Sequence, residues 1–342
     1  PDPRPVALVA CLEDGPLKRE LAACTDDPVR RTSFSLGHRG APLHYPEHTR
    51  ESYVAAAAMG AGVIECDVTF TRDKQLVCRH AQDDLHTTTD ILLTPLAARC
   101  AQPFHPAQFD SQGTLLAPAA AECRTSDITL AEFRTLRGKR DGFDPRARTV
   151  EGYVRGGKAA SDPLGPGTGT LMSHAESIAL FRQLGVQMVP ELKQPVVIMP
   201  YDGMSQQQFA QRLIDDYRTA GVPPGAVWPQ SFNLADILYW IEREPEFGRQ
   251  AVYLEDAESA AELPVAAEFE RLHAQGVRIW APPLFALLAL DESGAIVPSP
   301  SARAAKAAGL ELVTWSLERS GALGAGQNGW YYQTIDAALH RE

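Results

Sequence analysis

The clearest chemical signal in the sequence is a pair of carboxylates two residues apart. Glu65 and Asp67 lie within residues 63–70, whose other members are mostly β-branched or apolar, so this segment is predicted to be a strand. Side chains two apart on a strand share a face, where two carboxylates would repel each other and lose hydration. A strand face in contact with water is the simpler alternative, but the apolar character of the strand favours burial. The pair therefore indicates a site for a hard divalent cation, Mg²⁺ or Ca²⁺.

A turn that carries a histidine and an arginine follows a short apolar stretch at residues 34–36. Gly37 and Gly40 bracket His38 and Arg39, and glycines allow a sharp turn and the close approach of a ligand. Imidazole changes charge near neutral pH, and the planar guanidinium suits a phosphate group. Taken alone, an incidental surface turn would explain these four residues more simply.

A second histidine is expected to come close to the carboxylate pair. The segment that ends at His80 is predicted to be a strand that returns from a turn at residues 71–74. A hairpin with that centre places His80 near Asp67, and Cys78 near Cys66. In isolation, His80 would be a structural histidine with satisfied hydrogen bonds.

In combination, these residues form a pattern over residues 37–80 that resembles the glycerophosphodiester phosphodiesterase family. Two departures are visible: His48 stands where the family usually has asparagine, and Ala81 where it usually has aspartate. Neither departure replaces a histidine or a carboxylate named above. The pattern comprises His38-Arg39-Gly40, Pro46-Glu47-His48-Thr49, Gly62-x-x-Glu65-x-Asp67-Val68, Thr71-x-Asp73 and His80.

The resemblance implies a metal-dependent phosphodiesterase, a hydrolase that cleaves glycerophosphodiesters such as glycerophosphocholine to glycerol 3-phosphate and an alcohol. It implies one divalent cation, Mg²⁺ or Ca²⁺, on Glu65, Asp67 and Glu191, with His38 and His80 as acid and base. In the implied mechanism the glycerol 2-hydroxyl attacks phosphorus and a cyclic phosphate forms, which water then opens. Direct attack by water on the diester is the alternative.

The same resemblance assigns residues to the substrate. Arg39 and Lys193 would contact the phosphate, Gln230 of a Gln-Ser-Phe motif would line the site, and Trp315 would pack on the alcohol. Glu47 would support the site as a further metal ligand or through a hydrogen bond. A solvated strand end for Lys193, a core position for Trp315 and a surface loop for Glu47 are the simpler alternatives.

Two other functions fit parts of the sequence. A sphingomyelinase D-like phospholipase, acting on lipid head groups, would share two histidines and an acidic metal site, but the Pro-Glu-His-Thr and Glu-Leu-Lys motifs suit it less well. A non-catalytic binding barrel would have to keep three carboxylates and two histidines without using them.

The elements that must position these residues alternate between strand and helix, which predicts a parallel sheet. With about eight strands, the expected fold is α/β, a closed (β/α)₈ TIM barrel whose active site lies at the C-terminal ends of the strands. Residues 1–33 are expected to form an N-terminal arm that packs on the barrel, and residues 34–342 the barrel itself. An insertion at about residues 85–172, with weak periodicity, is expected to select the alcohol.

The composition limits the kinds of partner that the protein can bind. The 342 residues carry 32 basic and 43 acidic side chains, a net charge of −11, which argues against nucleic acid or an anionic membrane as a partner. The longest apolar runs are too short to span a bilayer. The chain starts at Pro1 and is expected to have been trimmed. The indicated partner is a small-molecule diester. The sequence does not indicate an oligomeric state.

The cysteines favour an oxidising compartment. Their even number in loop-rich segments favours a periplasmic or secreted protein with disulfides, although six free thiols in a cytoplasmic enzyme remain an alternative. Six cysteines allow fifteen connectivities. Sequential pairing is one of them, and the predicted hairpin supports only its middle pair, Cys66–Cys78. The cysteines are residues 11, 24, 66, 78, 100 and 123.

Overall fold

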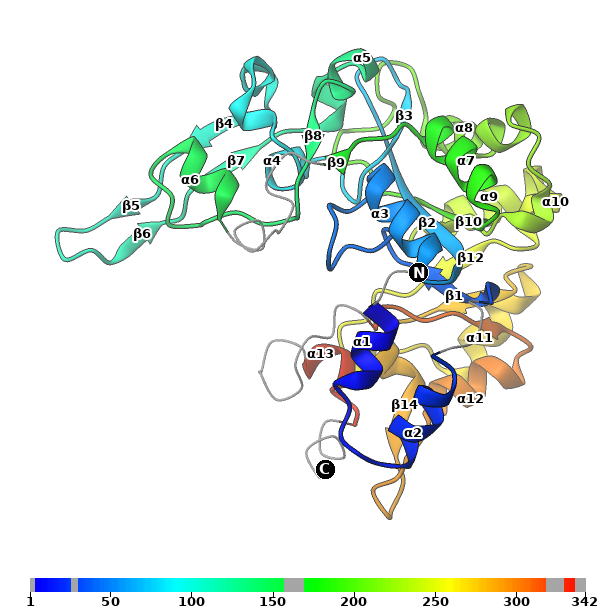
Figure 1. Cartoon of the computed structure of the whole chain (residues 1–342). Helices are drawn as coiled ribbons and strands as arrows, with labels where there is room; N and C mark the ends of the chain where they lie inside the picture. Colours follow the sequence, from blue (N-terminus) through cyan, green and yellow to red (C-terminus); the bar gives the residue numbers. More distant parts are fainter. Residues whose placement is uncertain (1–3, 26–29, 157–168, 318–328, 336–342) are drawn as a thin grey trace. The chain divides into compact units, whose positions relative to one another are not determined.

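The computed structural model describes residues 4–25, 30–156, 169–317 and 329–335. The chain divides into two compact units, an N-terminal unit of Pro1–Val189 and a C-terminal unit of Pro190–Glu342. Each unit is an assembly of strands and helices (Figure 1).

Two parallel strands and a hairpin organise the N-terminal unit. Strand β1 (Thr32–Gly37) pairs in parallel with β2 (Ala61–Phe70), and β3 (Leu76–Cys78) returns antiparallel to β2 with Val68 opposite Cys78. Every residue of β2 is buried, so its two carboxylates cannot be on a water-facing strand. The disulfide Cys66–Cys78 links the two strands of the hairpin, as predicted.

Two capped helices cover this sheet segment. Helix α3 (Arg50–Ala58) begins at Thr49, whose hydroxyl accepts a hydrogen bond from the Ser52 amide. Helix α7 (His174–Leu184) begins with a reciprocal capping box between Ser173 and Glu176. Small residues on α3 allow it to pack closely against β2 and α7.

The insertion is a folded subdomain with its own core, which its weak periodicity did not reveal. Buried apolar residues, among them Leu85, Phe133 and Tyr153, form one cluster, and the disulfide Cys100–Cys123 closes a second loop. Its small sheets are seen beyond β3 in Figure 1. Residues 157–168 of the expected insertion lie outside the described ranges. Its elements are α4 (Leu85–Thr88), β4 (Gln102–His105), β5 (Gln108–Phe109), β6 (Leu115–Ala117), β7 (Ala120–Glu122), α5 (Leu130–Phe133), β8 (Arg137–Gly138), α6 (Val150–Arg155) and β9 (Gly169–Thr170), with 3₁₀ turns at Ile91–Leu93, Pro95–Arg99 and Thr125–Asp127.

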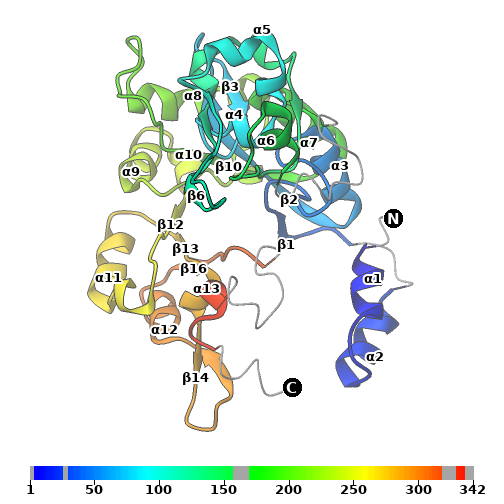
Figure 2. The same ribbon diagram turned by 90° about the vertical axis from the view of Figure 1, so that its left-hand side faces the viewer.

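The C-terminal unit is a run of parallel strands with helices between them. Neighbouring strands pair in the order β10, β11, β12, β13, β16, and helices α11 and α12 lie beside the later strands (Figure 2). Strand β10 begins in the N-terminal unit and ends in this one. The elements are β10 (Gln187–Leu192), α8 (Gln206–Thr219), β11 (Gln230–Ser231), α9 (Leu234–Arg243), α10 (Pro245–Gly248), β12 (Val252–Leu254), α11 (Ala266–Ala274), β13 (Ile279–Ala281), β14 (Leu288–Leu290), β15 (Ile296–Pro298), α12 (Pro300–Ala307), β16 (Glu311–Leu312) and α13 (Gly329–Tyr332).

The α/β class with parallel strands is confirmed, and so is the hairpin predicted to return the chain from the turn at residues 71–74. The segment that ends at His80 is β3, which runs antiparallel because a tight turn can only return the chain alongside β2. Within the described residues, the strands with parallel partners are β1, β2, β10, β11, β12, β13 and β16.

The N-terminal arm contains two helices, α1 (Arg4–Ala10) and α2 (Pro16–Ala23), and no residue of α2 is buried. Its described residues include Cys11 and Cys24, both free and exposed. Sequential pairing is therefore wrong for this first pair of cysteines. Within the described ranges, every helix is too short or too polar to cross a membrane.

Candidate active site

The predicted site residues fall into two groups, one in each unit. In the N-terminal unit, His38 and Arg39 follow β1, and Glu65 and Asp67 lie on β2. His80 follows β3, and the loop before α3 supplies Glu47. The C-terminal unit holds the other four, Glu191, Lys193, Gln230 and Trp315.

Arg39 joins the turn after β1 to two carboxylates. Its backbone has φ of 54°, in the left-handed region that non-glycine residues seldom adopt. In this conformation its amide donates to Glu65 Oε2 at 2.8 Å, while its guanidinium Nη1 donates to both oxygens of Glu47 at 3.1 Å. Burial alone would lower the pKa of Arg39, but the charges of Glu47, Asp67 and Glu65 raise it above its usual value. The group is therefore a permanent cation inside the site.

The carboxylate pair on β2 is buried, as predicted. Glu65 is 6% exposed and Asp67 1%. Burial raises the pKa of Glu65, and the charge of Asp67 raises it further, while His38 and Arg39 act in the opposite direction. His38 Nε2 lies 3.8 Å from Glu65 Oε2. Two buried oxygen donors whose charges oppose one another suit a hard divalent cation.

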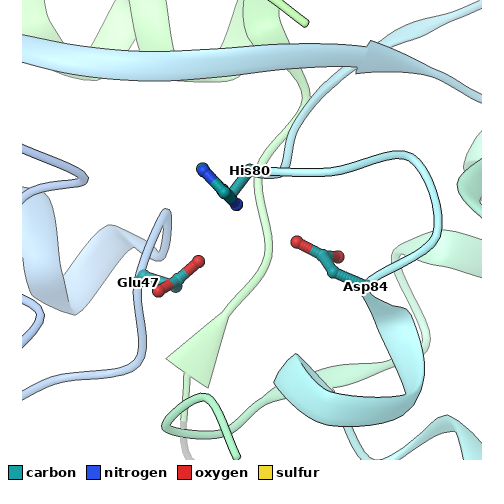
Figure 3. Close-up of side chains that lie close together, drawn as sticks. All are labelled: Glu47, His80 and Asp84. Atoms are coloured by element: carbon teal, nitrogen blue, oxygen red, sulfur yellow. The ribbon is translucent and has the colours of Figure 1, made fainter. Parts of the chain in front are cut away.

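His80 lies between two carboxylates. The imidazole of His80, the carboxylate of Glu47 and that of Asp84 point toward a common space, each offering a polar atom within 4.8 Å of the others (Figure 3). Asp84 precedes α4, and its carboxylate accepts hydrogen bonds from the Ala81 amide at 3.0 Å and the Thr88 hydroxyl at 3.2 Å. Sequence reasoning missed Asp84, although Ala81, where the family has aspartate, was a signal to look for another carboxylate nearby.

This second cluster could hold a cation, but its surroundings favour acid–base chemistry. Arg39 already neutralises Glu47, and the fully buried Arg79 donates from Nη2 to the Glu47 carbonyl at 2.7 Å. Burial raises the pKa of Asp84 to about 6, although the charge of Arg79 lowers it. With arginines supplying the positive charge, the carboxylates can orient the His80 imidazole.

His48, which stands where the family usually has asparagine, contacts a predicted metal ligand. Its Nε2 lies 2.9 Å from Asp67 Oδ2 and its Nδ1 lies 3.0 Å from the Tyr53 hydroxyl. The side chain is fully buried. The departure from the family motif, two residues after Pro46, was itself the signal that could have drawn attention to it.

The four predicted residues of the C-terminal unit also form one group. Glu191 and Lys193 make an ion pair, and Gln230 is the strand partner of Glu191 across β10 and β11. The Lys193 ammonium lies 5.9 Å from the centre of the Phe232 ring, which meets Trp315 edge-on at 6.0 Å. Phe232 thus connects the charged and aromatic parts of the group, a role that sequence reasoning did not assign.

Comparisons with known proteins identify the family of the chain. A sequence profile of the Glycerophosphoryl diester phosphodiesterase family matches residues 38–332. A relative in Arthroderma benhamiae described as "Extracellular protein" is 42% identical over 205 residues, covering 58% of this chain and 84% of the relative. A glycerophosphodiester phosphodiesterase of Arabidopsis thaliana is 30% identical over 136 residues, covering 39% and 34%.

Solved structures share the fold. An Oleispira antarctica phosphodiesterase, determined in complex with the product sn-glycerol-3-phosphate, superposes with a TM-score of 0.51 at 18% identity, covering 92% of this chain and 97% of that one. A glycerophosphodiester phosphodiesterase from Parabacteroides distasonis gives 0.50 at 14% identity, covering 90% and 91%. The family profile spans more than half of the chain, both histidines and every predicted metal ligand. The chain belongs to the Glycerophosphoryl diester phosphodiesterase family.

Proposed function

We propose that this protein is a metal-dependent phosphodiesterase that hydrolyses glycerophosphodiesters, such as glycerophosphocholine, to glycerol 3-phosphate and an alcohol. The observation that carries the proposal is the buried carboxylate pair Glu65 and Asp67, with His38 beside Glu65. Family membership supports it, as does the product, sn-glycerol-3-phosphate, in the related Oleispira antarctica structure.

The proposal includes the architecture and the compartment. The parallel strands would close into a (β/α)₈ barrel over residues 34–342, with residues 1–33 as an arm and the insertion at residues 85–172 covering the substrate side. Two disulfides and the extracellular relative support a secreted or periplasmic location.

A divalent cation fits the residues present. The raised pKa of Glu65, caused by burial and by the charge of Asp67, indicates that this pair needs positive charge beyond that of Arg39. Glu65, Asp67 and Glu191 would hold Mg²⁺ or Ca²⁺, because both ions prefer oxygen ligands such as carboxylates. When bound, the cation would supply charge neutralisation at a phosphate oxygen.

The two histidines would move the protons. One imidazole would take the proton of the glycerol 2-hydroxyl as that oxygen attacks phosphorus. The other would give a proton to the departing alcohol oxygen, so that the P–O bond breaks without forming an alkoxide. Glu47 and Asp84, which lie beside His80, would orient its imidazole for this transfer, and His38 and His80 would share the acid and base roles. Water would then open the cyclic phosphate with the roles exchanged.

The remaining residues would bind the substrate. Arg39 and Lys193 would balance the charge that accumulates on the phosphate oxygens. Gln230 would offer an amide to the same region, and the aromatic pair Phe232 and Trp315 would pack against the apolar part of the substrate. The insertion, which has its own core, would determine which alcohol is admitted.

Histidine substitutions test the proposal. His38→Ala and His80→Ala should each lower kcat for glycerophosphocholine at least about 100-fold, the usual contribution of a general acid or base. His273→Ala, on α11 of the C-terminal unit, is the matched control and should keep wild-type activity. Circular dichroism should show all three variants folded. A folded His38 or His80 variant with near wild-type turnover would refute the assignment.

A further inference from the structure

A chain of three buried side chains ends on the carboxylate of Asp67. Tyr53, His48 and Asp67 are each 0–1% exposed. The Tyr53 hydroxyl is 3.0 Å from His48 Nδ1, and His48 Nε2 is 2.9 Å from Asp67 Oδ2. Both contacts have the length of a hydrogen bond, so both imidazole nitrogens are engaged by defined partners.

The chemistry of the partners assigns the protons. An ionised carboxylate can only accept, so His48 Nε2 must carry the hydrogen that it donates to Asp67. With its hydrogen on Nε2, the neutral imidazole has an acceptor at Nδ1. The Tyr53 hydroxyl therefore donates to Nδ1. The two hydrogen bonds therefore run in one direction: Tyr53 donates to His48, and His48 donates to Asp67.

The backbone holds His48 in the orientation that this chain needs. Its φ is 55°, a conformation that non-glycine residues seldom adopt, and its amide donates to the Arg39 carbonyl at 3.1 Å. Tyr53 lies within the first turns of α3, which begins at the Thr49 cap, and its ring meets Phe181 edge-on at 4.8 Å. His48 and Tyr53 are thus held in place by contacts within the protein rather than by solvent.

We propose that His48 is a positioning residue that orients the Asp67 carboxylate for the cation by donating from Nε2, and that Tyr53 locks the imidazole tautomer that makes this possible. The inference rests on the metal role proposed for Asp67. A carboxylate with one oxygen held by a fixed donor cannot rotate freely, so less conformational entropy is lost when it ligates a cation. Groups in this position commonly alter metal affinity about 10- to 100-fold.

Two variants separate the links of the chain. Tyr53→Phe removes one hydroxyl without changing the shape of the core, so only the tautomer lock is lost. His48→Asn installs the residue that the family usually has, which tolerates a positive φ but is too short to link Tyr53 to Asp67. Tyr153→Phe removes a hydroxyl from another buried tyrosine of the same unit, in the core of the insertion, and is the matched control.

The first measurement needs neither metal nor substrate. A long-range ¹H–¹⁵N correlation spectrum of the metal-free protein labelled with ¹⁵N-histidine reports which ring nitrogen is protonated, and His48→Asn identifies the signal. We expect the proton on Nε2 in the wild type and in Tyr153→Phe, and a mixture of tautomers in Tyr53→Phe. A wild-type proton on Nδ1 alone would overturn the inference.

The second measurement is calorimetric titration of EDTA-treated protein with MgCl₂ or CaCl₂. The Kd should rise about threefold to tenfold in Tyr53→Phe, the equivalent of one lost hydrogen bond, and by about tenfold or more in His48→Asn. Tyr153→Phe should match the wild type. An unchanged Kd in Tyr53→Phe overturns the positioning role alone, whereas a wild type that binds neither ion overturns the metal site and the inference with it.

Discussion

At the scale of single residues, the site is held by backbone conformations that cost energy. Arg39 and His48 both have positive φ, and the His48 amide donates to the Arg39 carbonyl. Such strain persists only where surrounding contacts over-determine it, and it is common at functional sites. The turn thereby directs the Arg39 amide to one carboxylate and its guanidinium to another.

Residue types and spacing predicted the buried carboxylate pair, but not the contacts of its neighbours. Glu65 and Asp67 could be identified because strand periodicity relates residues two apart. His48 and Asp84 could not, because their partners are set by loop conformation, and no periodicity governs a loop. The carboxylate of Asp84 comes near His80 only through the turn that precedes α4.

Asp84 should make stability depend on pH. Its pKa is raised from 3.8 to about 6 in the folded protein, so between these values the folded state holds a proton that the unfolded chain has lost. Stability should therefore fall as pH rises from 4 to 6. The Asp84→Asn variant should not lose stability in this way. The difference in free energy of unfolding, variant minus wild type at the same pH, should therefore increase by up to about 3 kcal/mol between pH 4 and 7.

Urea denaturation of both proteins in EDTA, at several pH values, measures this difference. The comparison within each pH cancels the titration of the other groups. A difference that stays constant from pH 4 to pH 7 would show that Asp84 ionises in the folded protein as it does in the unfolded chain.

At the scale of elements, α3 fixes the loop that carries Arg39. The Ser52 hydroxyl donates to the Arg39 carbonyl at 3.1 Å and accepts from the Ala41 amide at 2.7 Å. Gly40 stands between these two residues with φ of 88°, and a Cβ there would lie 2.8 Å from the Ser52 carbonyl carbon. The helix can approach this closely only because residue 40 has no side chain.

Gly40→Ala should therefore lower the free energy of unfolding by more than the positive φ alone would explain. Gly113, in the β5–β6 turn, has φ of 85°, but a Cβ at this residue would meet no atom within 4 Å, so Gly113→Ala measures the backbone cost, about 1–2 kcal/mol. Gly40→Ala adds a clash with Ser52 and should cost about 1–3 kcal/mol more, with loss of phosphodiesterase activity. Thermal and urea unfolding would measure both, and equal costs would contradict the close packing of α3.

Elements of regular structure were predictable where periodicity and caps agreed. Helix α7 carries such signals, since its Ser173–Glu176 capping box marks the start and its apolar face marks the buried side. The insertion was harder because its strands are two to four residues long, too short to establish a period of two. Its stability comes from a shared core and the Cys100–Cys123 disulfide, which local patterns do not reveal.

At the scale of the whole molecule, charge must be organised locally. A chain with net charge −11 would repel an anionic diester unless its site were positive, and the N-terminal unit buries Arg39 and Arg79 beside its carboxylates. The alternation of strands and helices predicted the parallel α/β class. Barrel closure could not be derived from that pattern, since it depends on how every strand pairs with the next.

The most direct test of the central claim is release of glycerol 3-phosphate from glycerophosphocholine. The protein is treated with EDTA, assayed, and assayed again after Mg²⁺ or Ca²⁺ is restored. We expect activity to disappear with EDTA and to return with at least one of the ions, because the buried carboxylates need a cation before they can accept an anionic phosphate. Activity that is unaffected by EDTA, or hydrolysis of sphingomyelin without hydrolysis of glycerophosphocholine, would contradict the account.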